Sequence, residues 1–167
     1  MGIFYVKNRL GQYGRPIKIC KFRSMVPYSD VLYDELRRTH GLDDYGKIKN
    51  DFRITRIGKI IRPLCFDELP QMFTNIPRGE MSWVGIRARD ETEWSEYPEY
   101  HKREALEHKP GLFGVGRLSE GGSSSGVLKI ERQYLQEKAE RPFLTDLKYF
   151  LKLLYTVPIK EVKKIIN

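Results

Sequence analysis

The amino-acid sequence predicts one α+β domain, and three observations support this fold class. Residues 3–24 carry the pattern of paired strands, amphipathic helical patterns occupy most of the remaining chain, and no internal repeat divides it. The 167 residues suffice for one core, and 40% hydrophobic with 31% charged residues is typical of a folded protein. We therefore expect a single domain over residues 1–167, with several short amphipathic helices around its middle and amphipathic helices at its C-terminus.

The N-terminal segment predicts a β-hairpin over residues 3–24. Residues 3–6 are rich in strand-forming side chains, and residues 16–22 alternate between apolar and polar ones. Glycines at both ends of residues 11–14 supply the turn between the two strands.

The next segment predicts a helix over residues 31–40. Ser29 and Asp30 are residue types that cap helix N-termini, and Gly41 is suited to end the helix. Residues 41–52 are polar and predict a loop.

The middle of the chain predicts short helices and one strand. Isoleucines recur at helical spacing over residues 54–61, and Pro63 would end that helix. A second short helix is expected to start near Asp67, because aspartate is a favourable N-cap and proline is tolerated in a first turn. Residues 81–84 predict a short strand, and the highly charged residues 90–107 are predicted to be helical.

The C-terminal third predicts loops followed by two helices. Residues 110–114 predict a turn-rich loop, and the Gly/Ser-rich residues 121–126 a flexible segment, for which a linker is favoured over a mobile lid. Helical patterns cover residues 127–139 and 143–157. We interpret the apolar stripe on the last helix as core packing in preference to a membrane role.

The composition favours anionic partners. The net charge is +8 and the pI is near 9.4, which suits phosphates, nucleic acid or acidic lipid headgroups. Cys20 and Cys65 lack metal-ligand spacing and predict buried, reduced thiols, and the histidines form no zinc pattern. No apolar run approaches the roughly 20 residues that span a bilayer, and no signal peptide opens the chain. We therefore expect a soluble or peripheral protein.

The most informative motif is Asp67-Glu68-Leu69-Pro70-Gln71, two adjacent carboxylates in a stretch rich in arginine and lysine. One interpretation is structural, since acidic residues in a first helical turn satisfy free N–H groups. The other is catalytic: Asp67 would be an ionised nucleophile, and Glu68 would ligate Mg²⁺ together with substrate phosphate oxygens. Cations suited to neutralise a diphosphate are Lys21, Arg23, Arg53, Arg62 and Arg87.

Other anion-binding chemistries have no motif in this sequence. There is no phosphate-binding glycine loop, no dinucleotide fingerprint and no RNA-binding sheet signature. A basic nucleic-acid-binding module would explain the charge but would give the carboxylate pair no role. We therefore expect no nucleic-acid partner.

Four ordered blocks, with several single residues, resemble the bacterial sugar transferase family, the monotopic polyprenyl-phosphate phosphoglycosyl transferases. The blocks are Lys21-Phe22-Arg23-Ser24-Met25, Arg53-Ile54-Thr55-Arg56-Ile57-Gly58, Asp67-Glu68-Leu69-Pro70-Gln71 and Gly79-Glu80-Met81-Ser82-Trp83-Val84-Gly85. The further matches are Tyr97, Tyr100, Arg103, Pro110-Gly111 and Asp146-Leu147-Lys148. The resemblance covers nearly the whole chain.

The resemblance implies transfer of a phosphosugar from a nucleotide-diphosphate sugar, such as a UDP-sugar, to a polyprenyl phosphate. This reaction starts lipid-linked glycan assembly at the cytoplasmic face of the bacterial inner membrane. By resemblance, Asp67 would attack the sugar-proximal phosphate and form a covalent phosphosugar intermediate, and Glu68 would ligate Mg²⁺. Lys21, Arg62 and Arg87 would contact phosphate.

The sequence departs from the family pattern at four places. The family's N-terminal re-entrant membrane helix is missing before residue 3, so we expect an excised domain or a truncated protein that docks through basic charge and apolar helix faces. Two family prolines are replaced by Ile86 and Ala88, the segment 112–118 is changed, and a family aspartate falls on Tyr134. These changes leave one alternative open, a catalytically impaired relative that acts as a nucleotide-sugar- or membrane-binding scaffold. Neither the sugar nor the oligomeric state is predicted.

Overall fold

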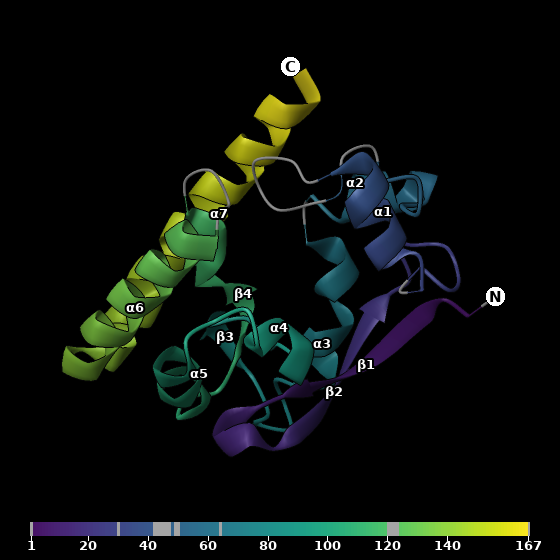
Figure 1. Ribbon diagram of the computed structural model, residues 1–167. Helices are drawn as coiled ribbons and strands as arrows, with labels where there is room; N and C mark the ends of the chain where they lie inside the picture. Colours follow the sequence, from purple (N-terminus) through teal and green to yellow (C-terminus); the bar gives the residue numbers. More distant parts are fainter. Residues whose placement is uncertain are drawn as a thin grey trace.

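The computed structural model confirms the α+β class, with an N-terminal hairpin, a middle of short helices around a small sheet, and two long C-terminal helices (Figure 1). The two long helices, α6 and α7, lie side by side at one edge of the molecule, away from the hairpin. The structure describes residues 2–29, 31–41, 48, 51–63, 65–119 and 124–166.

The hairpin forms as predicted. Strands β1 (Phe4–Leu10) and β2 (Pro16–Phe22) are antiparallel, with Phe4 opposite Phe22 and Leu10 opposite Pro16. The turn is a 3-10 helix over Gln12–Gly14. Ile17 and Ile19 of β2 point into the core, so one face of the hairpin is buried.

Helix α1 (Tyr33–His40) confirms the predicted helix but not its cap. Gly41 ends it in a positive-φ conformation, as expected. The residue that precedes the helix is Leu32, and its side chain forms no capping hydrogen bond. The expected capping by Ser29 is therefore wrong. Asp30, the other expected cap, lies outside the described residues. Most of the expected loop over residues 41–52 also lies outside them.

Helix α2 (Arg56–Ile61) ends before Pro63, as predicted. It begins after Thr55, whose hydroxyl accepts a hydrogen bond from the Gly58 amide at 2.9 Å. A Cβ at Gly58 would lie 2.1 Å from the carbonyl oxygen of Ser24. Only glycine therefore allows α2 to approach the segment after β2 this closely.

A parallel two-stranded sheet forms in the middle of the fold. Strand β3 (Ser82–Gly85) confirms the predicted strand, but β4 (Gly111–Gly114) forms where a loop was expected. A Cβ on Gly111 would lie 2.1 Å from the backbone nitrogen of Gly85, so the two main chains touch. The strand was missed because its glycines lack strand propensity and its partner is distant in sequence.

The charged segment between these strands confirms the helical prediction over most of residues 90–107, but it forms two helices with a break between them. Helix α4 (Glu91–Trp94) starts with a capping box between Asp90 and Glu93. Helix α5 (Glu99–Leu106) starts after Pro98, whose fixed backbone separates the two.

Helices α6 (Ser124–Glu140) and α7 (Pro142–Ile166) are longer than the segments expected at 127–139 and 143–157. Residues 124–126, expected to be flexible, belong to α6, while residues 121–123 are not described. The main core lies where these helices meet β3 and the 3-10 helix η3 (Val115–Leu118). Its most buried side chains are Val84, Val115, Tyr134, Tyr149 and Leu153.

The apolar stripe of α7 is mostly exposed, so the core interpretation is wrong for most of it. Phe150 packs against the core, together with Tyr149 and Leu153. The exposed members are Phe143, Leu144, Leu147, Leu151, Leu154 and Tyr155. The apolar surface of α7 is wider than the side that α6, η3 and β3 can cover. None of the described helices combines the length and the apolar composition that crossing a membrane requires.

A buried charged cluster joins α6 to the segment after β3. Glu131, fully buried, accepts one hydrogen bond from Arg89 at 2.7 Å and pairs with His101 at 2.9 Å. The Arg89 guanidinium also lies over the ring of Tyr97, 4.3 Å from its centre. The cluster therefore anchors the chain on which Arg87 stands.

We expect Glu131→Gln to lower the free energy of unfolding by about 3 kcal/mol, because it leaves the buried charge of Arg89 without its counterion. Urea denaturation at pH 7 measures this loss. The matched control is Glu140→Gln on the same helix, which is exposed and should change stability by less than about 0.5 kcal/mol. Equal effects of the two substitutions would contradict a structural role for the cluster.

Candidate active site

The carboxylate pair lies in a tight turn. Asp67 and Glu68 belong to the 3-10 helix η2 (Phe66–Glu68), and helix α3 (Pro70–Phe73) follows directly. Cys65, which precedes η2, has a left-handed backbone with φ of 60°. Both carboxylate residues are only 8% exposed. The turn therefore buries the adjacent side chains of Asp67 and Glu68 together.

Asp67 is not the helix cap that the sequence predicted. The residue before η2 is Cys65 and the residue before α3 is Leu69, and neither helix has a side-chain cap. Pro70 does lie in the first turn of α3, as expected. Because η2 has only three residues, burial and the surrounding charges, and not a helix terminus, govern the ionisation of the pair.

Glu68 is held ionised by cations from two other segments. Lys21, near the end of β2, donates to its Oε1 at 2.5 Å, and Arg117 of η3 lies 3.9 Å from its Oε2. Burial alone would raise the pKa of Glu68, but Lys21, Arg87 and Arg117 outweigh burial and lower that pKa to about 2. Glu68 is therefore a carboxylate at neutral pH.

Asp67 has a different environment from its neighbour. In the described part of the chain, no hydrogen bond or ion pair reaches its carboxyl group. Burial and the adjacent charge of Glu68 raise its pKa, against the opposing effect of Lys21, Arg62 and Arg117. Glu68 thus engages the nearby cations, and the oxygens of Asp67 remain available to a reactant.

The structure brings three of the five predicted cations to the pair. Lys21 contacts Glu68 directly. Arg62, at the end of α2, donates to the hydroxyl of Ser24 at 3.3 Å, and its charge acts on Asp67. Arg87 follows β3, and its charge acts on Glu68, Lys21 and Arg62.

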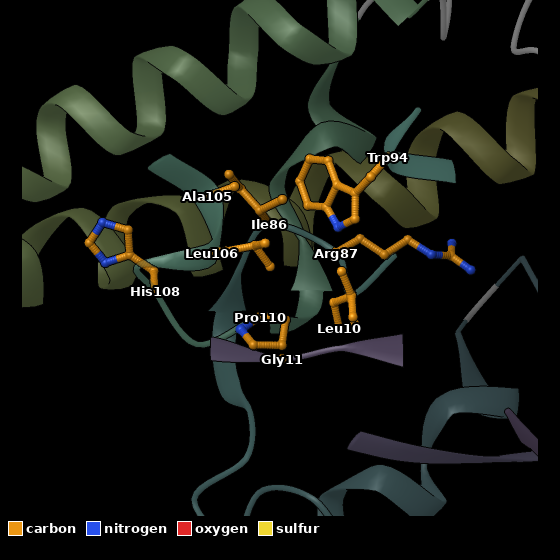
Figure 2. A pocket seen from close by; sticks show the side chains of 10 residues that line it. Leu10, Gly11, Ile86, Arg87, Trp94, Ala105, Leu106, His108 and Pro110 are labelled. Carbon is orange, nitrogen blue, oxygen red and sulfur yellow. The ribbon is translucent and has the colours of Figure 1, made fainter. Parts of the chain in front are cut away.

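Arg87 directs its charge outward. Its stem borders a cavity of about 10 Å³ that is lined mainly by apolar side chains, among them Leu10, Ile86 and Leu106. Figure 2 shows the guanidinium extending away from these side chains. The group is exposed and, across the described ranges, forms no salt bridge. It is therefore available to an anion.

Arg23 and Arg53 have structural partners instead. Arg23 donates to the backbone oxygens of Gly2 and Phe4, at 2.9 and 3.2 Å, and ties down the start of the hairpin. Arg53 is buried and donates two hydrogen bonds to the carboxylate of Asp51, at 2.8 and 2.7 Å. Their geometry favours a structural role over phosphate binding.

Arg117 was missed by the sequence reasoning. It belongs to a segment that departs from the family pattern, and only the fold brings η3 beside Glu68. The other departures are accommodated by packing: Ile86, Ala88 and Leu112 are buried in the core clusters. The hydroxyl of Tyr134 donates to Asp146 at 2.6 Å, and the ammonium of Lys138 contacts that hydroxyl at 2.8 Å.

The donor set suits a magnesium ion that arrives with a phosphate substrate. Within the described ranges, no group of three or more His, Cys, Asp or Glu side chains gathers for a metal. Asp67 and Glu68 supply two carboxylates, and Mg²⁺ commonly binds one or two carboxylates together with substrate phosphates and water. The residues present therefore fit this ion, with Glu68 as the ionised ligand.

Comparisons with known proteins find one matching family and several similar relatives. The model of the family described as bacterial sugar transferase matches residues 1–160. A UDP-galactose-lipid carrier transferase of Erwinia amylovora is 42% identical over 123 residues, which cover 69% of this chain and 25% of that protein. The undecaprenyl-phosphate galactose phosphotransferase of Salmonella typhimurium is 39% identical over 124 residues, 69% of this chain and 25% of that protein.

A shorter relative matches more evenly. The exopolysaccharide production protein ExoY of Rhizobium meliloti is 36% identical over 142 residues, which cover 80% of this chain and 62% of that protein. The chain thus spans between 25% and 62% of the length of these three relatives.

The pKa of Glu68 predicts a pH dependence of stability. The pKa of Glu68 in the folded chain is about 2, below the ordinary 4.5, so ionisation of this carboxyl group stabilises the fold at neutral pH by about 3 kcal/mol. This stabilisation is lost as the pH falls from about 5 to 2. We expect Glu68→Gln to flatten this part of the curve, measured by urea unfolding at pH 7, 5, 4 and 3.

Glu107→Gln is the control, because Glu107 is exposed. That variant should keep the pH slope of the parent chain. An unchanged slope in Glu68→Gln would show that the carboxylate is not held ionised by its neighbours.

Proposed function

Because the chain belongs to the bacterial sugar transferase family, we propose that it transfers a phosphosugar from a nucleotide-diphosphate sugar to a polyprenyl phosphate. The names of two relatives supply the substrate classes, a UDP-sugar donor and undecaprenyl phosphate as acceptor. The observation that carries the proposal is the carboxyl group of Asp67, which has no hydrogen bond or ion pair with any described residue and is buried among cations beside an ionised Glu68.

The proposed chemistry has two displacements at one phosphorus atom. First, a carboxylate oxygen of Asp67 attacks the sugar-proximal phosphorus, the bond to the bridging oxygen breaks, and the nucleoside monophosphate leaves with the electron pair. Then an oxygen of polyprenyl phosphate attacks the same phosphorus and the bond to Asp67 breaks. The carboxylate is regenerated, and the product is a polyprenyl diphosphosugar.

Charge neutralisation would come from the residues around the pair. Arg62, Arg87 and Arg117 would contact the phosphates, and Lys21 would stay on Glu68 and orient it. Glu68 would hold Mg²⁺, which supplies further neutralisation of the diphosphate when bound. Because the acid with hydrogen-bonding partners is Glu68, Asp67 is the better candidate for the nucleophile.

We further propose that the chain works at the cytoplasmic face of the bacterial inner membrane. A polyprenyl acceptor is a lipid, the net charge of +8 suits acidic headgroups, and α7 exposes a long apolar face. The scaffold alternative is less favoured, because the residues that depart from the family pattern at Ile86 and Tyr134 pack into the core and leave the pair intact.

We expect Asp67→Asn to abolish turnover, by more than about 10³-fold, because the amide is not a nucleophile for phosphorus. Glu68→Gln should reduce it by about 10²-fold or more. The assay measures nucleoside monophosphate released from a panel of UDP-sugars with detergent, undecaprenyl phosphate and Mg²⁺. Glu107→Gln, remote from the pair, is the control.

Mass spectrometry of the chain incubated with donor alone should find a phosphosugar adduct on Asp67. Normal turnover in Asp67→Asn would refute the assignment of Asp67 as the nucleophile. If no UDP-sugar led to release of nucleoside monophosphate, the scaffold alternative would be favoured.

A further inference from the structure

The side chain of Gln71 is buried beside the carboxylate pair and forms no hydrogen bond with any residue that the structure describes. It stands in the first turn of α3 and is 2% exposed. Its Nε2 atom is buried, and no partner for it exists among the residues that the structure describes. The other buried nitrogens of this kind belong to Trp94 and to the Arg89–His101 cluster, so Gln71 is the one beside the pair.

A second buried side-chain amide nearby, that of Asn75, has the hydrogen-bond partners expected of a structural group. Asn75, one turn further along, is fully buried, and its Nδ2 donates to the Lys18 carbonyl at 2.9 Å and to Glu80 at 2.7 Å. A buried amide without partners destabilises a folded protein, and native proteins rarely keep one. The contrast indicates that the partner of Gln71 is a molecule from outside the chain.

The surroundings of Gln71 indicate what that molecule is. Gln71 lines a cavity of about 20 Å³ together with Lys21, Glu68 and Arg87, with room for about one oxygen atom or water molecule. Arg9 also lines it but is paired with Asp90 at 2.6 Å. The unpaired charge of Arg87 therefore makes the cavity attractive to an anionic oxygen, which a phosphoryl group can supply and a sugar hydroxyl cannot.

We propose that the Gln71 amide donates to a phosphoryl oxygen of the bound nucleotide diphosphate and so helps position the phosphorus for Asp67. The inference rests on the proposed function and adds a neutral phosphate contact to the cations of that site. An amide is suited to this task because its neutral NH2 group donates to the oxygen, whereas a further cation would compete with Lys21 and Arg117 for the Glu68 carboxylate.

The test compares Gln71→Met with Asn75→Leu. Methionine has nearly the shape of glutamine but no polar group, so Gln71→Met should leave the melting temperature of the free chain unchanged or raise it. Its dissociation constant for uridine diphosphate, measured by calorimetry with Mg²⁺, should rise about tenfold or more. Asn75→Leu should lower the melting temperature by several degrees and leave the dissociation constant of the folded protein unchanged.

Three outcomes would overturn the inference. A lower melting temperature with unchanged binding in Gln71→Met would make the amide structural. No change in either quantity would mean that the amide meets only a water molecule. If the parent chain did not bind uridine diphosphate, a nucleotide diphosphate could not be the partner of Gln71.

The proposed function is judged separately, by release of nucleoside monophosphate from the parent chain. Turnover by the parent chain with equal turnover in Gln71→Met would keep the function and refute the inference. If the parent chain bound uridine diphosphate through Gln71 but showed no turnover, the inference would stand and the proposed function would be refuted.

Discussion

The ion pair between Lys21 and Glu68 is the constraint on which the candidate site depends. Its partners come from the hairpin and from η2, which are distant in sequence and are brought together with most of both side chains removed from water. Such burial is tolerated only if the two charges meet, so the pair requires the end of β2 to lie against η2. In this ion pair the ammonium group of Lys21 contacts Glu68. Among the described residues, Asp67 is then the acid of the pair with no ion pair, so its oxygens can meet a reactant.

Much of the fold could be predicted where the signal lies within one segment. The hairpin, the helix ended by Gly41 and the helix ended by Pro63 have local patterns, and all three form. Strand β4 has no local signal, because it depends on its main-chain contact with β3. The apolar stripe of α7 shows a different failure: periodicity tells where apolar side chains lie around a helix, and only the packing partners decide which of them are covered.

The site was predictable to the extent that its residues lie in recognisable motifs. The sequence identified the carboxylate pair and three cations that the fold gathers around it. Cation density could not distinguish Arg53, which a carboxylate two residues away already neutralises. Arg117 was missed because its position beside Glu68 depends on the whole fold. The role that we propose for Gln71 had no sequence signal either, because it rests on a buried amide with no partner among the described residues.

The direct contact between Gly85 and Gly111 links the two arginines that approach Glu68 from the sheet. Since β3 and β4 are parallel, their carboxyl ends emerge at the same edge, and Arg87 and Arg117 each follow one of these ends by a few residues. The spacing between the backbones of the two arginines is therefore governed by main chain that cannot move apart or closer without losing the sheet. The connection from β3 to β4 is divided accordingly. The part that carries Arg87 and the buried Arg89–His101 cluster is constrained, and its exposed residues can vary without moving the backbone of either arginine.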